Sequence, residues 1–209
     1  MAERKSLGSK PVPLTIATTD TKTGTSAVTH NLTSVTAGAL LVVTTGNQNS
    51  STNCTVSSSP TLTWTKQVDN ATPNAEIWTA VYTAGGNINV TANWGSNRQS
   101  SVCYVVTGQY SPPGGNTNTA SSQNAPNLSV TSSRINSLIF CITTNWNAIT
   151  GTRTYRGAPT ESYYNPQTES TFFHYYYTCS TVTSYTLGFT APSDIDNGSG
   201  TAALEIKNE

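Results

Sequence analysis

Charged residues are scarce in this chain: lysine, arginine, aspartate and glutamate make up 10% of its 209 residues, ten basic against ten acidic. Nucleic-acid binding draws its affinity from clustered lysine and arginine. The one basic cluster here is ERKSLGSK, close to the start of the sequence. The composition therefore argues against a nucleic-acid partner, and Thr, Ser, Asn and Gln must wet the surface in place of ions.

Long apolar runs are also missing. No stretch approaches the roughly 18 to 20 consecutive apolar residues of a membrane-spanning helix, so we expect no membrane span. The opening residues, MAERKSLGSKPVPL, carry positive charge without an apolar region behind it, which is unlike a secretory signal peptide. Two routes stay open: a signal removed from this sequence, or synthesis in the cytoplasm followed by virion assembly and lysis.

Groups that could converge for catalysis are few. The two histidines, His30 and His174, lie at or within strand-like patterns, where we expect structural roles. No Gly-x-Ser-x-Gly, His-Glu-x-x-His or phosphate-binding glycine loop occurs. The carboxylates that a glycoside hydrolase would pair are too scattered to nominate any two of them: Asp69, Glu76, Glu161 and Glu169. We therefore predict a protein that is not an enzyme and has no cofactor.

Metal and redox motifs are equally weak. The four cysteines show no Cys-x-x-Cys spacing, so small buried residues with reduced thiols are favoured, and a single disulfide is the open alternative. The loop SDIDNGSG offers oxygen ligands from Asp194, Asp196 and Asn197. It lacks the full spacing of a calcium loop and its distant bidentate glutamate. A solvated turn is the favoured interpretation, and no metal site is predicted.

Short stretches of alternating apolar and polar residues are what the chain does contain. In INVTANW the residues Ile88, Val90, Ala92 and Trp94 share one face, as in a half-buried strand. Thr, Val, Tyr and Trp suit a pleated surface, and Gly, Pro, Asn and Ser clusters separate the runs. Hydrophobic residues, 35% of the chain, gather in these runs, unlike those of a disordered polar tract. The pattern predicts an all-β protein.

The second half of the sequence repeats the pattern of the first. Three segments recur in the same order: 31–49 as 127–147, 76–94 as 172–189, and 101–109 as 201–208. The segment between the halves, SPPGGNTNTASSQNAP at 111–126, is too polar and too rich in Gly and Pro for a strand. We expect it to carry the chain across the end of a sandwich.

The repeat predicts an antiparallel jelly-roll-type β-sandwich built from two related halves, about 28–110 and 127–208. We expect that neither half buries an apolar face alone, so the halves should pack face to face as one sandwich. A single domain over 14–209 follows. The matched strands Leu40 to Thr45 and Leu138 to Thr143 are predicted to anchor its core.

Hydrophobic and turn patterns continue from residue 28 to residue 208 through THNLTSVTAGALLVV, VSSSPTLTWTKQ, AEIWTAVYTAGGNINVTANW, SSVCYVVTGQYSPPGG and the closing GTAALEIKN. In these segments the chain resembles a broad group of β-sandwich modules from bacterial surface proteins and from structural proteins of tailed phages. The resemblance identifies a fold rather than an activity. It implies a non-catalytic role in virion decoration, adhesion or glycan binding.

Two functions from different classes are predicted. The first is an external decoration or fibre-like protein of a tailed phage, located on the virion surface with other virion proteins as partners and forming a homo-oligomer. It rests on the absent signal peptide, the low charge, the uncharged polar surface and the resemblance. The second is a carbohydrate-binding or adhesion module of a bacterial surface protein, extracellular or on the cell surface, with glycans as its ligands.

Aromatic residues outside the alternating pattern indicate where a glycan would bind. Trp146 follows an apolar strand in an Asn-rich turn, and Tyr155, Tyr163 and Tyr164 lie in TRTYRGAPTESYYNPQ, which we expect to be a loop. Exposed aromatic planes can stack on sugar rings while Asn, Gln and Arg supply hydrogen bonds. The alternative is that these aromatics fold back and cap the end of the sandwich.

The N-terminal arm, residues 1–13, holds Arg4, Lys5 and Lys10, three of the ten basic residues. Its two prolines disfavour regular pairing, so we expect the arm to be mobile in isolation. On a larger particle it could anchor the protein in an acidic groove of a partner. The alternative is a frayed terminus without a function.

Overall fold

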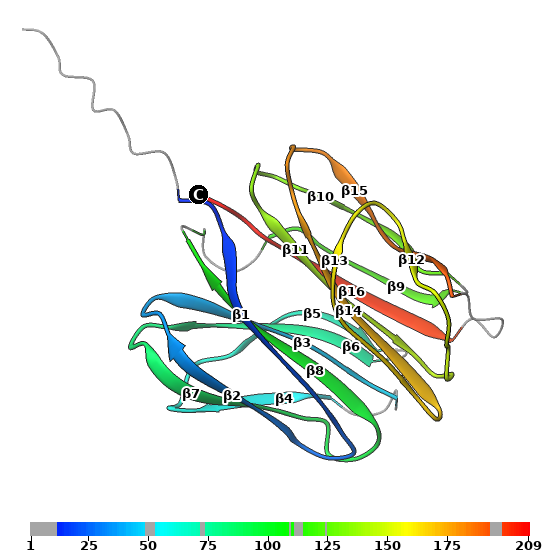
Figure 1. The fold of residues 1–209 in the computed structure, drawn as a ribbon, viewed down its shortest axis with the longest axis horizontal. Coiled ribbons are helices and arrows are strands. Elements are labelled where there is room, and N and C mark those ends of the chain that lie inside the picture. Colours follow the sequence, from blue (N-terminus) through cyan, green and yellow to red (C-terminus); the bar gives the residue numbers. More distant parts are fainter. Residues whose placement is uncertain are drawn as a thin grey trace, which may run out of the picture.

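The protein is all-β (Figure 1). The structure, a computed structural model, describes residues 12–48, 53–71, 74–108, 110, 115–123, 125–192 and 198–209. Within these ranges there are sixteen strands and no helix. The strands of the first half are β1 (Thr15–Gly24), β2 (Val28–Val35), β3 (Ala39–Asn47), β4 (Thr55–Ser59), β5 (Thr65–Ala71), β6 (Asn74–Tyr82), β7 (Gly86–Asn93) and β8 (Gln99–Thr107). Those of the second half are β9 (Thr117–Gln123), β10 (Asn127–Thr131), β11 (Leu138–Asn145), β12 (Thr154–Tyr155), β13 (Thr160–Gln167), β14 (Ser170–Thr178), β15 (Ser184–Ala191) and β16 (Ser199–Ile206).

Both halves have the same topology. The first half has a five-stranded sheet in the order β1-β8-β3-β6-β5 and a three-stranded sheet in the order β2-β7-β4. The second half has β9-β16-β11-β14-β13 and β10-β15-β12, so adding eight to each strand number converts one half into the other. This is the strand order of a jelly roll, with the fifth strand moved to the edge of the larger sheet. The antiparallel β-fold in two similar halves is confirmed.

Each half encloses a core of its own. In the first half Leu41, Val43 and Trp94 pack between the two sheets, and in the second half Ile139 and Phe173 do so. The expectation that neither half buries an apolar face alone is therefore wrong. Eight strands give each half two sheets that face one another, and that is enough for a closed sandwich. The molecule has four layers, with the two five-stranded sheets in the middle.

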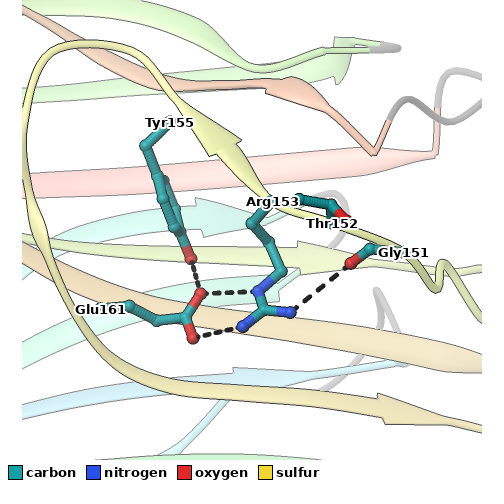
Figure 2. Close-up of a pocket in the computed structure, with 5 residues that line it drawn as sticks. All are labelled: Gly151, Thr152, Arg153, Tyr155 and Glu161. Carbon is teal, nitrogen blue, oxygen red and sulfur yellow. Dashed lines mark hydrogen bonds and ion pairs between the residues drawn. The ribbon is translucent and has the colours of Figure 1, made fainter.

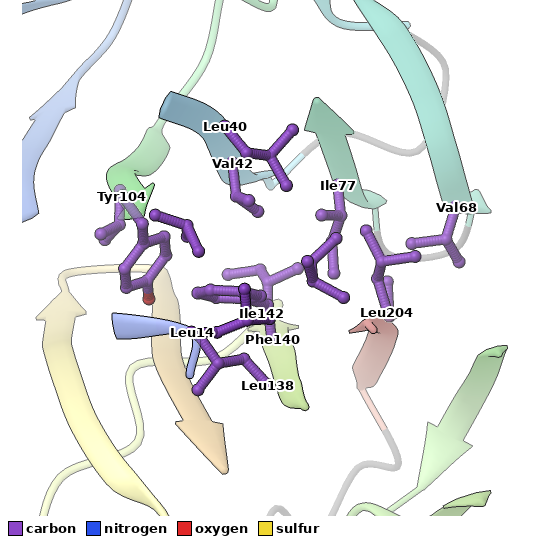
Figure 3. Packing of buried hydrophobic residues seen from close by; sticks show 14 of the residues in the cluster. Leu14, Leu40, Val42, Val68, Ile77, Tyr104, Leu138, Phe140, Ile142 and Leu204 are labelled. Atoms are coloured by element: carbon purple, nitrogen blue, oxygen red, sulfur yellow. The ribbon is translucent and has the colours of Figure 1, made fainter. Parts of the chain in front are cut away.

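A third core joins the halves (Figure 3). Leu40 and Val42 of β3 pack there against Phe140 and Ile142 of β11, and the Tyr104 ring lies 4.8 Å from that of Phe140. Since successive side chains of a strand point to opposite faces, β3 and β11 are buried on both sides. This explains the uninterrupted apolar runs ALLVV and LIFCI. The burial of β3 and β11 also confirms that the matched strands predicted from the repeat lie in the core.

Close approach of the two middle sheets requires a glycine in β3. A Cβ atom on Gly46 would overlap the hydroxyl group of Thr144 in β11. A larger residue at this position would force the Thr144 side chain to move and would press on Asn74 and Phe172. The glycine is therefore part of the contact between the halves, and it does not serve a turn.

The segment between the halves holds a strand that the sequence did not predict. Thr117–Gln123 forms β9, which pairs with β16 at the edge of the second five-stranded sheet. An edge strand needs hydrogen bonds along one side only. Side chains such as those of Asn118 and Thr119 remain exposed, so no apolar alternation marks the strand in the sequence. The expectation of a strand-free 111–126 connection is wrong for this reason.

Both histidines are buried and hydrogen-bonded. His174 of β14 reaches into the first half, with Nδ1 2.8 Å from Thr44 Oγ1 and Nε2 2.9 Å from Ser100 Oγ. His30 of β2 has Nε2 3.0 Å from Ser101 Oγ. Burial lowers the pKa of His174 to about 3 and that of His30 to about 4, so both rings are neutral at pH 7. Both histidines thus lie in strands as packed, hydrogen-bonded residues, in agreement with the sequence pattern.

Truncating one buried residue of each sandwich core should destabilise the protein strongly. Leu41→Ala and Ile139→Ala should each lower the free energy of unfolding by about 2 to 5 kcal/mol, because each leaves a cavity at a fully buried site. Urea unfolding followed by tryptophan fluorescence measures this loss. Ile135→Ala is the control: that side chain is 55% exposed, so its truncation should cost less than about 0.5 kcal/mol. Losses below about 1 kcal/mol at both buried sites would contradict this placement of the core.

Stability should decrease as the pH falls below about 6.5, where the histidines of the unfolded chain begin to protonate. The folded-state pKa values are depressed to about 4 and about 3, so protons bind the unfolded chain first. The stabilisation is complete above the unfolded pKa and is lost as the pH falls toward the folded values. From pH 7 to pH 5 each histidine should account for a loss of about 2 kcal/mol.

Urea unfolding at a series of pH values measures this dependence. The double variant His30→Gln/His174→Gln should lose most of the slope between pH 7 and pH 5, whatever its absolute stability. An equal slope in the variant and in the parent would assign the pH dependence to other groups.

Candidate functional site

A cleft of about 580 Å³ opens in the second half, beside β12 and β13 (Figure 2). Its lining residues come from the segment that leads into β12, from β12 itself and from the start of β13: Gly151, Thr152, Arg153, Tyr155 and Glu161. Both strands are at sheet edges, β12 in the three-stranded sheet and β13 in the five-stranded sheet. The cleft therefore lies where the two sheets of the second sandwich part.

Three polar side chains are tied together in the cleft. Arg153 donates from Nε to Glu161 Oε2 and from Nη2 to Oε1, each at 2.8 Å, which is a bidentate ion pair. The hydroxyl group of Tyr155 donates to Glu161 Oε2 at 2.7 Å. The guanidinium group lies 4.2 Å from the centre of the Tyr164 ring. These contacts hold the guanidinium and the carboxylate in one orientation.

The protonation states of the cleft are fixed near neutral pH. The hydrogen bonds from Arg153 lower the pKa of Glu161, and the same bonds raise the pKa of Arg153. Burial raises the pKa of Tyr155, so its hydroxyl group stays protonated. The side chains of Arg153 and Glu161 remain 32% and 28% exposed. The cleft thus presents N–H donors and carboxylate acceptors side by side to solvent, with no net charge from the pair.

Of the predicted glycan-binding residues, Tyr155 lines this cleft, and Tyr164 contacts it through the guanidinium group of Arg153. Both rings are partly buried and already have aromatic or cationic neighbours: Tyr155 packs 5.0 Å from Tyr175, and Tyr164 contacts Arg153 and Phe173, whose ring centre is 5.2 Å away. Tyr155 belongs to β12 and Tyr164 to β13, so the expectation of a loop is wrong for both. Their backbones pair with β15 and β14, an arrangement that residue composition does not reveal.

The other two predicted residues lie elsewhere. Tyr163, also in β13, points to the opposite face of its sheet and packs against the core between the halves, with its ring centre 6.3 Å from that of His174. Trp146 follows β11, is 40% exposed, and donates its backbone N–H to the carbonyl of Gly198. Neither residue lines the cleft.

Arg153 and Glu161 were not predicted as a site. In the sequence Glu161 is one of several scattered carboxylates, and seven residues separate it from Arg153. The signal that could have found them is a pair of opposite charges on either side of the turn-forming RGAP segment. Such a turn brings its two flanks together.

The first half places an ion pair of opposite polarity at the equivalent position. Lys66 lies opposite Trp78 as Glu161 lies opposite Tyr175, and a β-bulge follows both Lys66 and Glu161. Nζ of Lys66 is 3.1 Å from Glu76 Oε1 and 5.6 Å from the centre of the Trp78 ring. One scaffold position therefore carries a cation in the first half and an anion in the second.

The side chains of Asp20, His30 and Ser101 contact one another in the order acid, histidine, serine that hydrolytic triads have. His30 Nδ1 is 3.4 Å from Asp20 Oδ2, and His30 Nε2 is 3.0 Å from Ser101 Oγ. His30 and Ser101 are both completely buried. A nucleophile needs access to its substrate, so this arrangement is structural.

The remaining sequence predictions have mixed outcomes. All four cysteines are buried free thiols, as expected. In the part of the chain that the structure describes, no three His, Cys, Asp or Glu residues gather to hold a metal, and no helix is long and apolar enough to span a membrane. Two predicted elements lie outside the described residues: the loop residues Asp194, Asp196 and Asn197, and the arm residues Arg4, Lys5 and Lys10.

No family model matches the chain, and comparisons with curated proteins and with solved structures found no match. The resemblance to phage and bacterial surface modules therefore stays a prediction. The duplicated fold and the cleft are the two features of the molecule that bear on its function.

Proposed function

We propose that the protein is a non-catalytic structural protein of a virus particle, an external decoration or fibre-like protein of a tailed phage. The observation that carries this proposal is the duplicated jelly-roll order of the strands. Jelly rolls are a common architecture of viral capsid domains and of lectins, so the support is an analogy at the level of the fold. The scarcity of charged residues and the Thr-, Ser- and Asn-rich composition agree with it.

The arrangement of the layers also supports a structural role. The three-stranded sheets are the outer layers, one contributed by each half. Because the halves share one topology, the molecule has two outer faces of similar construction on opposite sides. A chain with two such faces can contact two neighbouring proteins of a particle at once.

Particles of the phage that encodes this chain should contain the protein, and its gene should lie beside capsid or tail genes. Mass spectrometry of particles purified on a density gradient tests the first point, and immunogold labelling tests whether the protein is external. A major capsid protein of the same particle is the positive control. Particles that contain capsid proteins but lack this chain would contradict the proposal.

The cleft favours carbohydrate binding as a second candidate function. Two neighbouring hydroxyl groups of a sugar can bridge a guanidinium and a carboxylate, one accepting from Arg153 and the other donating to Glu161. The hydroxyl of Thr152 lies at the same cleft and adds a further partner. The bidentate pair is held in place before a ligand arrives, which reduces the entropy lost on binding.

Removing Arg153 should weaken glycan binding by at least about tenfold, because the donor is lost and Glu161 is no longer held. A glycan array followed by calorimetry on the best ligand measures this effect. Tyr164→Ala should act in the same direction, since its ring supports the guanidinium group. Arg134→Ala and Trp146→Ala are controls outside the cleft and should leave binding unchanged. If Trp146→Ala abolished binding and the cleft variants did not, the glycan-binding site would lie outside this cleft.

A further inference from the structure

A second cavity of about 450 Å³ lies on the other side of the connection between β12 and β13. Gly157 and Ala158 of that connection line it, together with residues of β14, of β15 and of the hairpin between them. The residues just before and just after the connection, Tyr155 and Glu161, line the first cleft. The two cavities therefore flank the same short segment of chain.

A continuous row of tyrosine rings runs from one cavity to the other. The centre of the Tyr155 ring is 5.0 Å from that of Tyr175, Tyr175 is 6.1 Å from Tyr177, and Tyr177 is 6.4 Å from Tyr185. Tyr155 lines the first cleft, and Tyr177 and Tyr185 line the second cavity. The linings of the two cavities are thus linked through Tyr175, which is itself fully buried.

The connection between the cavities is short and firmly held. The hydroxyl group of Tyr177 donates to the carbonyl of Arg156 at 2.6 Å, and Arg156 donates its backbone N–H to Gly188 and its Nε to Pro126. Gly157 follows with a positive φ of 66°, and a Cβ atom there would come within 3.3 Å of the Tyr177 ring. A glycine therefore lets the connection, the ridge between the two cavities, lie close against the Tyr177 ring.

The chemistry of the second cavity is uncharged. Hydroxyl groups line it, among them those of Ser184 and Thr186, which are exposed, and of Tyr185, which is partly exposed. The lining residues that the structure describes include no charged side chain, and the Arg153–Glu161 pair of the first cleft is neutral as a unit. Hydroxyl groups beside aromatic rings suit a ligand that is rich in hydroxyl groups and carries no charge.

We propose that the two cavities are subsites of one extended site, which takes a neutral oligosaccharide lying across the β12–β13 connection. This inference rests on the second proposed function, carbohydrate binding at the first cleft. One sugar unit contacts Arg153 and Glu161, and units further along the same oligosaccharide occupy the cavity beside Tyr177 and Tyr185. Binding energy from the second cavity is available only to a ligand long enough to cross the ridge.

Calorimetric titration with oligomers of increasing length tests the extended site. The probes are glucose, galactose and N-acetylglucosamine series from the monosaccharide to the hexasaccharide. For the series that binds, affinity should rise by at least about tenfold from the monosaccharide to the tetrasaccharide and then level off. An affinity that is independent of length would overturn the extended site.

Ala158→Trp fills the second cavity and supplies the matched variant. It should lower tetrasaccharide affinity to that of the monosaccharide and leave monosaccharide affinity unchanged. Val182→Trp adds the same side chain at a nearby residue that is 59% exposed and does not line the cavity, and it should have no effect. Melting temperatures of both variants confirm that they are folded.

The outcomes separate this inference from the function on which it rests. If no saccharide series binds, Arg153→Ala has no binding to remove. The proposal of carbohydrate binding is then wrong, and the extended site that depends on it is wrong as well. If saccharides bind at the Arg153 cleft but Ala158→Trp leaves tetrasaccharide affinity unchanged, carbohydrate binding stands and the extended site is wrong.

Discussion

Face-to-face packing of the two five-stranded sheets is the contact on which the rest of the structure depends. The strands β3 and β11 are internal to these sheets, and each is shared between two cores: Leu40 faces the opposite half, while Leu41 faces the small sheet of its own half. A shift of either strand would disturb a sandwich and the interface together. Gly46 allows the sheets to approach, since any Cβ atom there would meet Thr144. Two jelly rolls that could each close alone are thereby combined in one four-layered body.

The polar end of this interface determines how the halves are aligned. His174 of the second half bonds to Thr44 and Ser100 of the first, and the amide group of Asn70 donates to the carbonyls of Ala120 and Thr201. A buried polar group without a partner costs free energy, so an alignment that broke these bonds would be disfavoured. Apolar packing alone tolerates many arrangements. The hydrogen bonds specify one of them.

The cleft lies where the two halves, alike in topology, differ in their side chains. Its residues lie on the segment that leads into β12 and on the edge strands β12 and β13, where side chains can change without disturbing a core. At the bulge that both copies share, the first half has Lys66 beside Glu76 and the second has Glu161 beside Arg153. The two halves therefore share one fold, whereas the Arg153–Glu161 pair of the cleft belongs to the second half.

The all-β class, the repeat and the strands that enter the cores can be predicted from the residues alone. Short segments of the sequence carry these features, because the burial of a strand such as Gly86–Asn93 alternates with a period of two residues. The sequence could not reveal β9, since an edge strand of polar residues has no apolar periodicity to detect. Nor could it decide between two layers and four, or join Arg153 to Glu161. The number of layers and the Arg153–Glu161 pair both depend on which strands meet in the folded protein. Contacts between strands distant in the chain leave no local pattern in the sequence, so these two features are visible only in the three-dimensional structure.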